Sequence, residues 1–148
     1  MTNTEKQLLK LISASQFGKG NMAFTDCDYI AVLKEAKAQA VLGIVAPEIP
    51  QKYVSEKDFE TIKNGIARQR AKYTRYLYEE DRLKNVLDSN AIPFVILKGN
   101  AAAMYYKNPA CRNMGDVDFL VGIEDFLRAK EVLQSEGYVL THEKLGVE

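Results

Sequence analysis

The seven residues 115–121, GDVDFLV, set two carboxylates two positions apart in an otherwise apolar run that favours a strand. Side chains alternate across a strand, so Asp116 and Asp118 are expected on one face and Val117 on the other. Two like charges side by side on a half-buried strand repel each other and cost desolvation energy, unless a cation lies between them. Because paired carboxylate oxygens suit Mg²⁺ or Mn²⁺, the sequence predicts a divalent metal site here.

The segment before this pair, residues 93–106 with the sequence PFVILKGNAAAMYY, predicts a strand, a glycine turn and a helix. The apolar run between Pro93 and Gly99 is typical of a buried strand, and the alanine-rich segment favours a helix capped by Asn100 or Gly99. The free N–H groups of such a helix start would face an anion. A phosphate-holding turn closely followed by two carboxylates is typical of a site for a metal ion and a triphosphate.

These motifs resemble the nucleotidyltransferase superfamily of polymerase-beta-like enzymes, whose signature is an apolar strand, a glycine turn, a helix and Asp-x-Asp on the next strand. Within it, the chain most resembles an uncharacterised bacterial group with a Leu-Lys-Gly turn, here residues 97–99, and a Gly-Asp-x-Asp strand, here residues 115–118. The resemblance is specific over residues 94–138. It implies Mg²⁺- or Mn²⁺-dependent transfer of a nucleoside monophosphate from a nucleoside triphosphate, such as ATP, to an acceptor hydroxyl of unknown identity.

The resemblance also implies roles for individual residues. Asp116 and Asp118 match the catalytic, metal-binding carboxylates, and Gly99 matches the glycine of the nucleotide-phosphate turn. Asn100 occupies the position where many members have Ser, and its amide N–H can still bind phosphate.

Two cations match positions that are characteristic of the closer group, Lys98 and Arg112. Either would neutralise triphosphate charge. Arg112 is the favoured phosphate ligand of the two, because a planar guanidinium binds two oxygens at once.

One departure from the superfamily pattern concerns the third carboxylate, which usually completes the metal site from a later strand. After Tyr138 the only acidic residues are Glu143 and Glu148, and neither lies in an apolar strand pattern. We therefore expect that the chain is a fragment whose parent supplies the third carboxylate beyond Glu148. The other interpretation is a degenerate member that binds nucleotide and metal as a regulatory or interaction module without transferring anything. A purely structural reading makes Asp116 and Asp118 a solvated strand end.

The expected fold class is α+β. Residues 1–90 are predicted to form a helical segment with a long helix at about 56–88, which starts at the capping pattern Ser55-x-x-Asp58. Residues 91–148 are predicted to form the polymerase-beta-like βαβαβ core, incomplete at its C-terminus, with a helix at 124–136 and a last strand at 138–140. The long helix either frames the nucleotide site or supports the sheet, and the second interpretation is favoured.

Charge and composition limit the partners. The chain has 148 residues with 20 Lys plus Arg and 20 Asp plus Glu, so long nucleic acid is not an expected partner. A local basic stretch from Lys63 to Arg75, with Tyr73 and Tyr76 interleaved, suits either RNA binding or a solvated helix face, and the second is favoured. The N-terminus has no signal pattern and no apolar run reaches membrane-spanning length, so a cytoplasmic protein is expected.

The remaining candidates for chemistry are weak. Cys27 and Cys111 are far apart and have no metal-ligand spacing, so both are interpreted as ordinary reduced residues. His142 is the single histidine and has no nucleophile partner.

Overall fold

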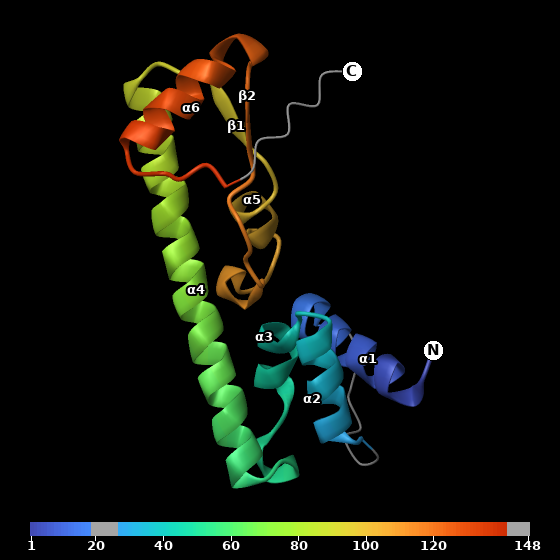
Figure 1. Cartoon of the computed structure of the whole chain (residues 1–148). Helices are drawn as coiled ribbons and strands as arrows, with labels where there is room; N and C mark the ends of the chain where they lie inside the picture. The colour runs from blue at the N-terminus through green and yellow to red at the C-terminus, as the bar shows by residue number, and fades with distance from the viewer. Residues whose placement is uncertain (19–26, 142–148) are drawn as a thin grey trace.

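A computed structural model of the chain describes residues 1–18 and 27–141 (Figure 1). Three helices form one core near the N-terminus. α1 (Asn3–Phe17) begins with a capping box, in which Thr2 and Glu5 each satisfy the other's backbone N–H. α2 (Tyr29–Ala38) is capped by the Asp28 carboxylate, and α3 (Leu42–Val45) follows it closely. The core between them is built mainly from aliphatic side chains: Leu8, Leu11, Val32, Ala36, Ile44 and Val45.

Two 3-10 turns, η2 (Ala46–Glu48) and η3 (Gln51–Tyr53), lead into α4 (Glu56–Ser89), a single helix of 34 residues. It begins where the Ser55 hydroxyl accepts a hydrogen bond from the Asp58 backbone N–H at 3.1 Å. At 1.5 Å per residue, α4 is roughly 51 Å long. Figure 1 shows that it extends from the N-terminal helices at one end to the sheet at the other.

The second half of the chain contains a small antiparallel sheet. β1 (Phe94–Ile96) pairs with β2 (Phe119–Val121) in the register Phe94↔Val121 and Ile96↔Phe119. The inward-facing side chains of both strands pack with Leu83 and Leu87 of α4 and with Ala129. The outward-facing Val95 and Leu120 are 60% and 58% exposed.

Short helices and turns complete this half. α5 (Asn100–Ala103) and η4 (Pro109–Cys111) lie between the strands in sequence, and η5 (Ile123–Asp125) and α6 (Phe126–Ser135) follow β2. The described chain is therefore mostly helical with a two-stranded sheet, an α+β fold. None of its helices is long and apolar enough to cross a membrane.

The expected βαβαβ order is observed only as far as βαβα. Residues 138–140 form no strand in the structure. Gly137, at a φ of 90°, ends α6, and the Tyr138 backbone N–H then donates to the Leu133 carbonyl as a helix cap. The Tyr138 ring lies against the Arg82 guanidinium, 4.8 Å from its centroid. Residue 138 therefore binds to α4 and α6, and not to the edge of the sheet.

Three further details differ from expectation. The helix after Gly99 is only four residues long, and the helix expected at 124–136 is α6 preceded by a 3-10 turn. Residues 116–118 precede β2, so the two carboxylates lie just before the strand and not within it. His142, Glu143 and Glu148 lie outside the described residues.

Candidate functional site

The last residue of β1 and the first residue of β2 lie side by side at one end of the sheet. Beyond the pair Ile96↔Phe119, the Leu97 backbone N–H donates to the Asp118 carbonyl at 2.8 Å. The turn at residues 98–100, which we call the 98–100 turn, therefore starts next to Asp118. The antiparallel pairing thus places the glycine turn beside one of the two carboxylates.

The two carboxylates lie on the side of the chain that faces away from the core. Val117 between them packs against both the sheet core and a cluster around Tyr76. Alternation along an extended segment then directs Asp116 and Asp118 to the opposite side. Asp116 is exposed and Asp118 is half-buried.

Asp118 forms an ion pair with the first residue of the turn. Lys98 Nζ lies 3.0 Å from Asp118 Oδ2, and the two side chains are 68% and 44% exposed. Ion pairs with this much solvent access contribute little to stability, about 0 to 1 kcal/mol. The significance of the pair is chemical, because an ammonium occupies the position next to a carboxylate where the sequence predicted a metal cation.

Within residues 1–18 and 27–141 the structure does not itself assemble the metal site that the sequence predicts. No group of three Asp, Glu, His or Cys side chains there is arranged to hold a metal ion. Asp116 and Asp118 are oxygen donors on one side of the chain, and the Lys98 ammonium shows that a cation is accommodated at Asp118. Carboxylate oxygens of this kind suit a hard divalent cation. The described residues supply two such carboxylates and no third donor side chain beside them.

The backbone of the 98–100 turn adopts a conformation that few side chains tolerate. Lys98 has a φ of 31°, and Gly99 has a φ of 57° with a ψ of −118°. A Cβ atom at Gly99 would lie 2.0 Å from the Tyr76 hydroxyl oxygen, so contact with α4 also excludes a side chain. The backbone N–H groups of Lys98 and Gly99 have no backbone acceptor in the described chain.

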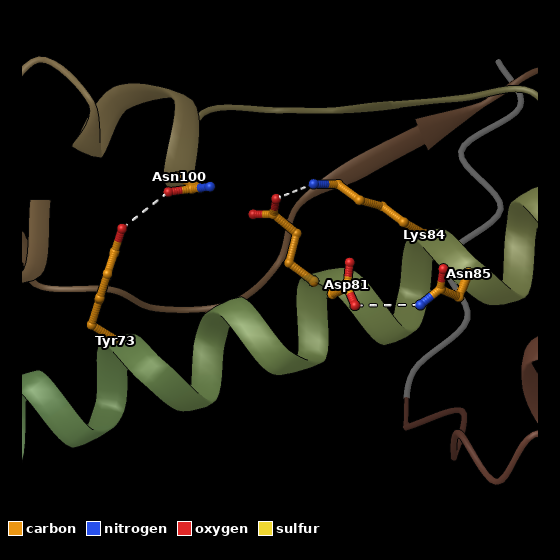
Figure 2. A network of polar contacts seen from close by, with 6 residues as sticks. Tyr73, Asp81, Lys84, Asn85 and Asn100 are labelled. Carbon is orange, nitrogen blue, oxygen red and sulfur yellow. Dashed lines mark hydrogen bonds and ion pairs between the residues drawn. The ribbon is translucent and has the colours of Figure 1, made fainter.

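Two tyrosines of α4, Tyr73 and Tyr76, contact this turn. The Tyr73 hydroxyl donates to Asn100 Oδ1 at 3.2 Å, as Figure 2 shows. Tyr76 is 5% exposed, and its hydroxyl has no hydrogen bond of standard geometry to another described residue. Burial raises the pKa of Tyr76, the nearby Glu80 carboxylate raises it further, and the Asn100 backbone N–H lowers it. The Tyr76 hydroxyl therefore remains protonated and close to the Asn100 backbone.

An ion pair between a buried carboxylate and a partly exposed lysine lies one helical turn farther along α4. Glu80 is 3% exposed and pairs with Lys84, whose side chain is labelled in Figure 2. Its second oxygen, Oε2, makes no hydrogen bond of standard geometry to another described residue, although the Glu80 carboxylate lies close enough to Tyr76 to interact with its hydroxyl. Glu80 faces the core and Tyr76, whereas Asp116 and Asp118 face away from it, so Glu80 is not a third member of the carboxylate pair.

Arg112 lies close enough to Tyr76 for its charge to act on the Tyr76 hydroxyl. Its Nη1 is 3.1 Å from Met114 Sδ, and its charge lowers the pKa of Tyr76. The guanidinium is half-buried, and none of the ion pairs within the described chain involves it. It is thus a cation near the turn whose charge is not neutralised by a carboxylate.

The two cysteines take no part in this arrangement. Both are free thiols, as expected from their spacing. Burial raises the pKa of Cys27 and of Cys111, so neither is a reactive thiolate at neutral pH.

Sequence reasoning missed the support that α4 gives to the turn. Tyr73 and Tyr76 are three residues apart and interleave with the basic stretch, which the sequence predicts to be a solvated helix face or an RNA surface. The basic residues Lys63, Arg68 and Arg75 are indeed exposed. The tyrosines instead face the turn. Their spacing of three residues places both on one helix face, and this is the feature of the sequence that indicates a shared contact.

Comparison with known proteins gives one match. A model of a protein family described as an uncharacterised nucleotidyltransferase matches residues 26–146, which include both strands, the 98–100 turn and both carboxylates. No curated protein and no solved structure matches the chain.

Proposed function

Because this chain belongs to the family of uncharacterised nucleotidyltransferases, we propose that it takes part in transferring a nucleoside monophosphate from a nucleoside triphosphate to an acceptor hydroxyl. The observation that carries the proposal is the adjacency of the 98–100 turn to Asp118, with the Lys98 ammonium 3.0 Å from the carboxylate. A site for a metal-bound triphosphate needs cations and N–H donors next to carboxylates.

The triphosphate is proposed to bind along the 98–100 turn. The backbone N–H groups of Lys98 and Gly99 have no backbone acceptor within the described chain and would donate to phosphate oxygens. Lys98 and Arg112 would supply positive charge, and Asn100 would add a side-chain N–H. The four-residue α5 is too short for its dipole to contribute much, so the individual donors carry the binding.

Asp116 and Asp118 are proposed to hold Mg²⁺ or Mn²⁺. A divalent cation held there would neutralise phosphate charge and lower the pKa of the acceptor hydroxyl. Lys98 has a double role in this proposal, because its ammonium pairs with Asp118 in the free chain and with a phosphate oxygen when nucleotide is bound.

In the proposed reaction the acceptor oxygen attacks the α-phosphorus as the bond from that phosphorus to the bridging oxygen breaks. The electron pair leaves with pyrophosphate, and the hydroxyl proton passes to a base. We propose that this base, and the third carboxylate of the site, come from outside the described residues. The acceptor itself stays unassigned.

The test is calorimetric titration of Mn²⁺ with each of ATP, GTP, CTP and UTP into the chain and into a variant with Asp116→Asn and Asp118→Asn. We expect nucleotide binding that requires the metal in the chain as given and none in the variant. Asp88→Asn is the matched control, because it removes an exposed carboxylate from the last turn of α4.

Lys98→Met gives a second, independent arm of this experiment. Removing the ammonium from Asp118 should tighten binding of Mn²⁺ alone by about two- to fivefold, the value of an exposed ion pair. The same change should weaken binding of the triphosphate. Nucleotide binding that survives loss of both carboxylates, or no binding by the unaltered chain, would contradict the proposed function.

A further inference from the structure

The side chain of Asn100 is held in one orientation by α4. An amide has one acceptor oxygen and one nitrogen with two donors, and either end can point toward a neighbour. The phenolic hydroxyl of Tyr73 donates to Asn100 Oδ1 at 3.2 Å. Figure 2 shows that the amide nitrogen then lies on the side of Asn100 that faces away from Tyr73.

The backbone of Asn100 is held by the same helix face. Tyr76 is three residues from Tyr73 and packs so closely under Gly99 that a Cβ atom there would lie 2.0 Å from its hydroxyl oxygen. The Asn100 backbone N–H is close enough to that oxygen to lower the pKa of Tyr76. Both the main chain and the side chain of Asn100 are therefore positioned by α4.

We propose that Tyr73 is a positioning residue, which directs Asn100 Nδ2 toward a phosphate oxygen of the bound nucleotide. The inference rests on the proposed function and extends it to a residue of the long helix. In this arrangement the Asn100 amide oxygen already accepts a hydrogen bond from the Tyr73 hydroxyl. The amide nitrogen, which is a donor, is therefore the atom available to the ligand. An acceptor at that position would repel phosphate, whereas an N–H attracts it.

The experiment measures the affinity of the full chain for inorganic tripolyphosphate with Mn²⁺ by calorimetry, so that no base or sugar contributes. Tyr73→Phe should weaken binding about fivefold, the net value of one hydrogen bond. Asn100→Ala should weaken it at least as much. The double variant should bind no more weakly than Asn100→Ala alone, because Tyr73 acts only through Asn100.

Tyr78→Phe is the matched control, since it removes a hydroxyl from an exposed tyrosine of α4 that lies away from the turn. It should leave tripolyphosphate affinity unchanged. An unchanged affinity in Tyr73→Phe would overturn the inference. So would a Tyr73→Phe effect of equal size with and without Asn100, since Tyr73 would then act on the site by another route.

A readout without ligand separates this inference from the proposed function. In the free chain, the Asn100 side-chain amide should give nuclear magnetic resonance relaxation typical of a rigid group, and Tyr73→Phe should make it mobile. If that signal is already mobile in the unaltered chain, the positioning role is wrong. Failure of the unaltered chain to bind tripolyphosphate would instead refute the proposed function, and with it any role of Tyr73 in that function.

Discussion

At the scale of single residues, the contact with Tyr76 of α4 constrains which residues the 98–100 turn can contain. Gly99 combines a positive φ with a close approach to Tyr76, so two independent constraints exclude a side chain at one position. Lys98 has a φ of 31° without being glycine, a conformation that costs energy and persists only where surrounding contacts enforce it. The turn is thus a strained element held against a rigid helix.

We predict that Gly99→Ala destabilises the chain by on the order of 3 kcal/mol, because the new methyl group meets the Tyr76 hydroxyl in a backbone conformation that alanine resists. Urea unfolding measures this cost. Adding Tyr76→Phe removes the nearest atom and should recover part of the loss. Gly115→Ala is the control, because a Cβ there meets nothing within 4 Å. Equal costs for the two alanine variants would show that Tyr76 does not constrain Gly99.

At the scale of elements, α4 is the one helix of the described chain that contributes to both the N-terminal core and the sheet core. Its first half contributes Ile62 and Ile66 to the N-terminal core, and its second half contributes Leu83 and Leu87 to the sheet core. Tyr73 and Tyr76 lie between these two contact regions. The favoured interpretation from the sequence was a supporting helix, and the structure gives α4 that role together with contact to the turn.

Interrupting α4 should therefore separate the unfolding of its two ends. Arg75 is exposed, and Arg75→Pro removes a backbone hydrogen bond in the middle of the helix at a cost of about 3 kcal/mol or more. We expect one sharp calorimetric transition for the unaltered chain, and a broadened or split transition for Arg75→Pro. Arg75→Ala should leave it sharp, because alanine keeps the helix intact. One sharp transition in Arg75→Pro would indicate that the two cores are coupled by contacts other than α4.

Long-range contacts explain where prediction from the sequence succeeded and where it did not. The helix expected at 56–88 is observed at Glu56–Ser89, since Ser55 caps its start and apolar residues repeat with helical period. The prediction of a third strand at residues 138–140 was wrong because residue 138 contacts α4 and α6 instead of the sheet. A strand forms only where a neighbouring strand shares its hydrogen bonds.

For the candidate site, the sequence names residues but not the contacts that they make. The pattern of glycine turn and carboxylates can be read locally, and it led to Lys98, Gly99 and Asp118, which the fold brings to one end of the sheet. The bond from Tyr73 to Asn100 joins residues 27 positions apart and has no local signature. Which residues of α4 contact the 98–100 turn depends on how the helix packs against it, and a single sequence does not specify that packing.

At the scale of the whole molecule, stability at alkaline pH depends on the N-terminal core. Tyr29 is 4% exposed and stacks on Tyr53 with ring centroids 5.1 Å apart. Burial, reinforced by Cys27 and Tyr53, raises the pKa of Tyr29 to about 12. An unfolded tyrosine titrates near pH 10, as an approximate reference value. Between the two values the folded chain keeps a proton that the unfolded chain has released.

The stabilising contribution of Tyr29 protonation is consequently complete below about pH 10 and is lost as the pH rises toward 12. The expected loss of unfolding free energy is on the order of 2 kcal/mol. Urea titrations at several pH values from about 9 to 12 would measure it. Tyr29→Phe should show a shallower decline, while Tyr78→Phe, which changes an exposed ring, should decline like the unaltered chain. An equally steep decline in Tyr29→Phe would assign the effect to other groups.

The outer side of the two-stranded sheet has a consequence for how the protein behaves in concentrated solution. Val95 and Leu120 expose apolar surface there, and within the described chain neither strand has a neighbour on its other edge. Strands of three residues offer few backbone groups for pairing, so the exposed apolar side chains are what would favour contact between copies, and a large net charge would oppose it. This chain has 20 positive and 20 negative side chains and an isoelectric point near 6.6, so at neutral pH its colloidal repulsion is weakest. Buffers well above or below that pH should keep it soluble at the highest concentrations.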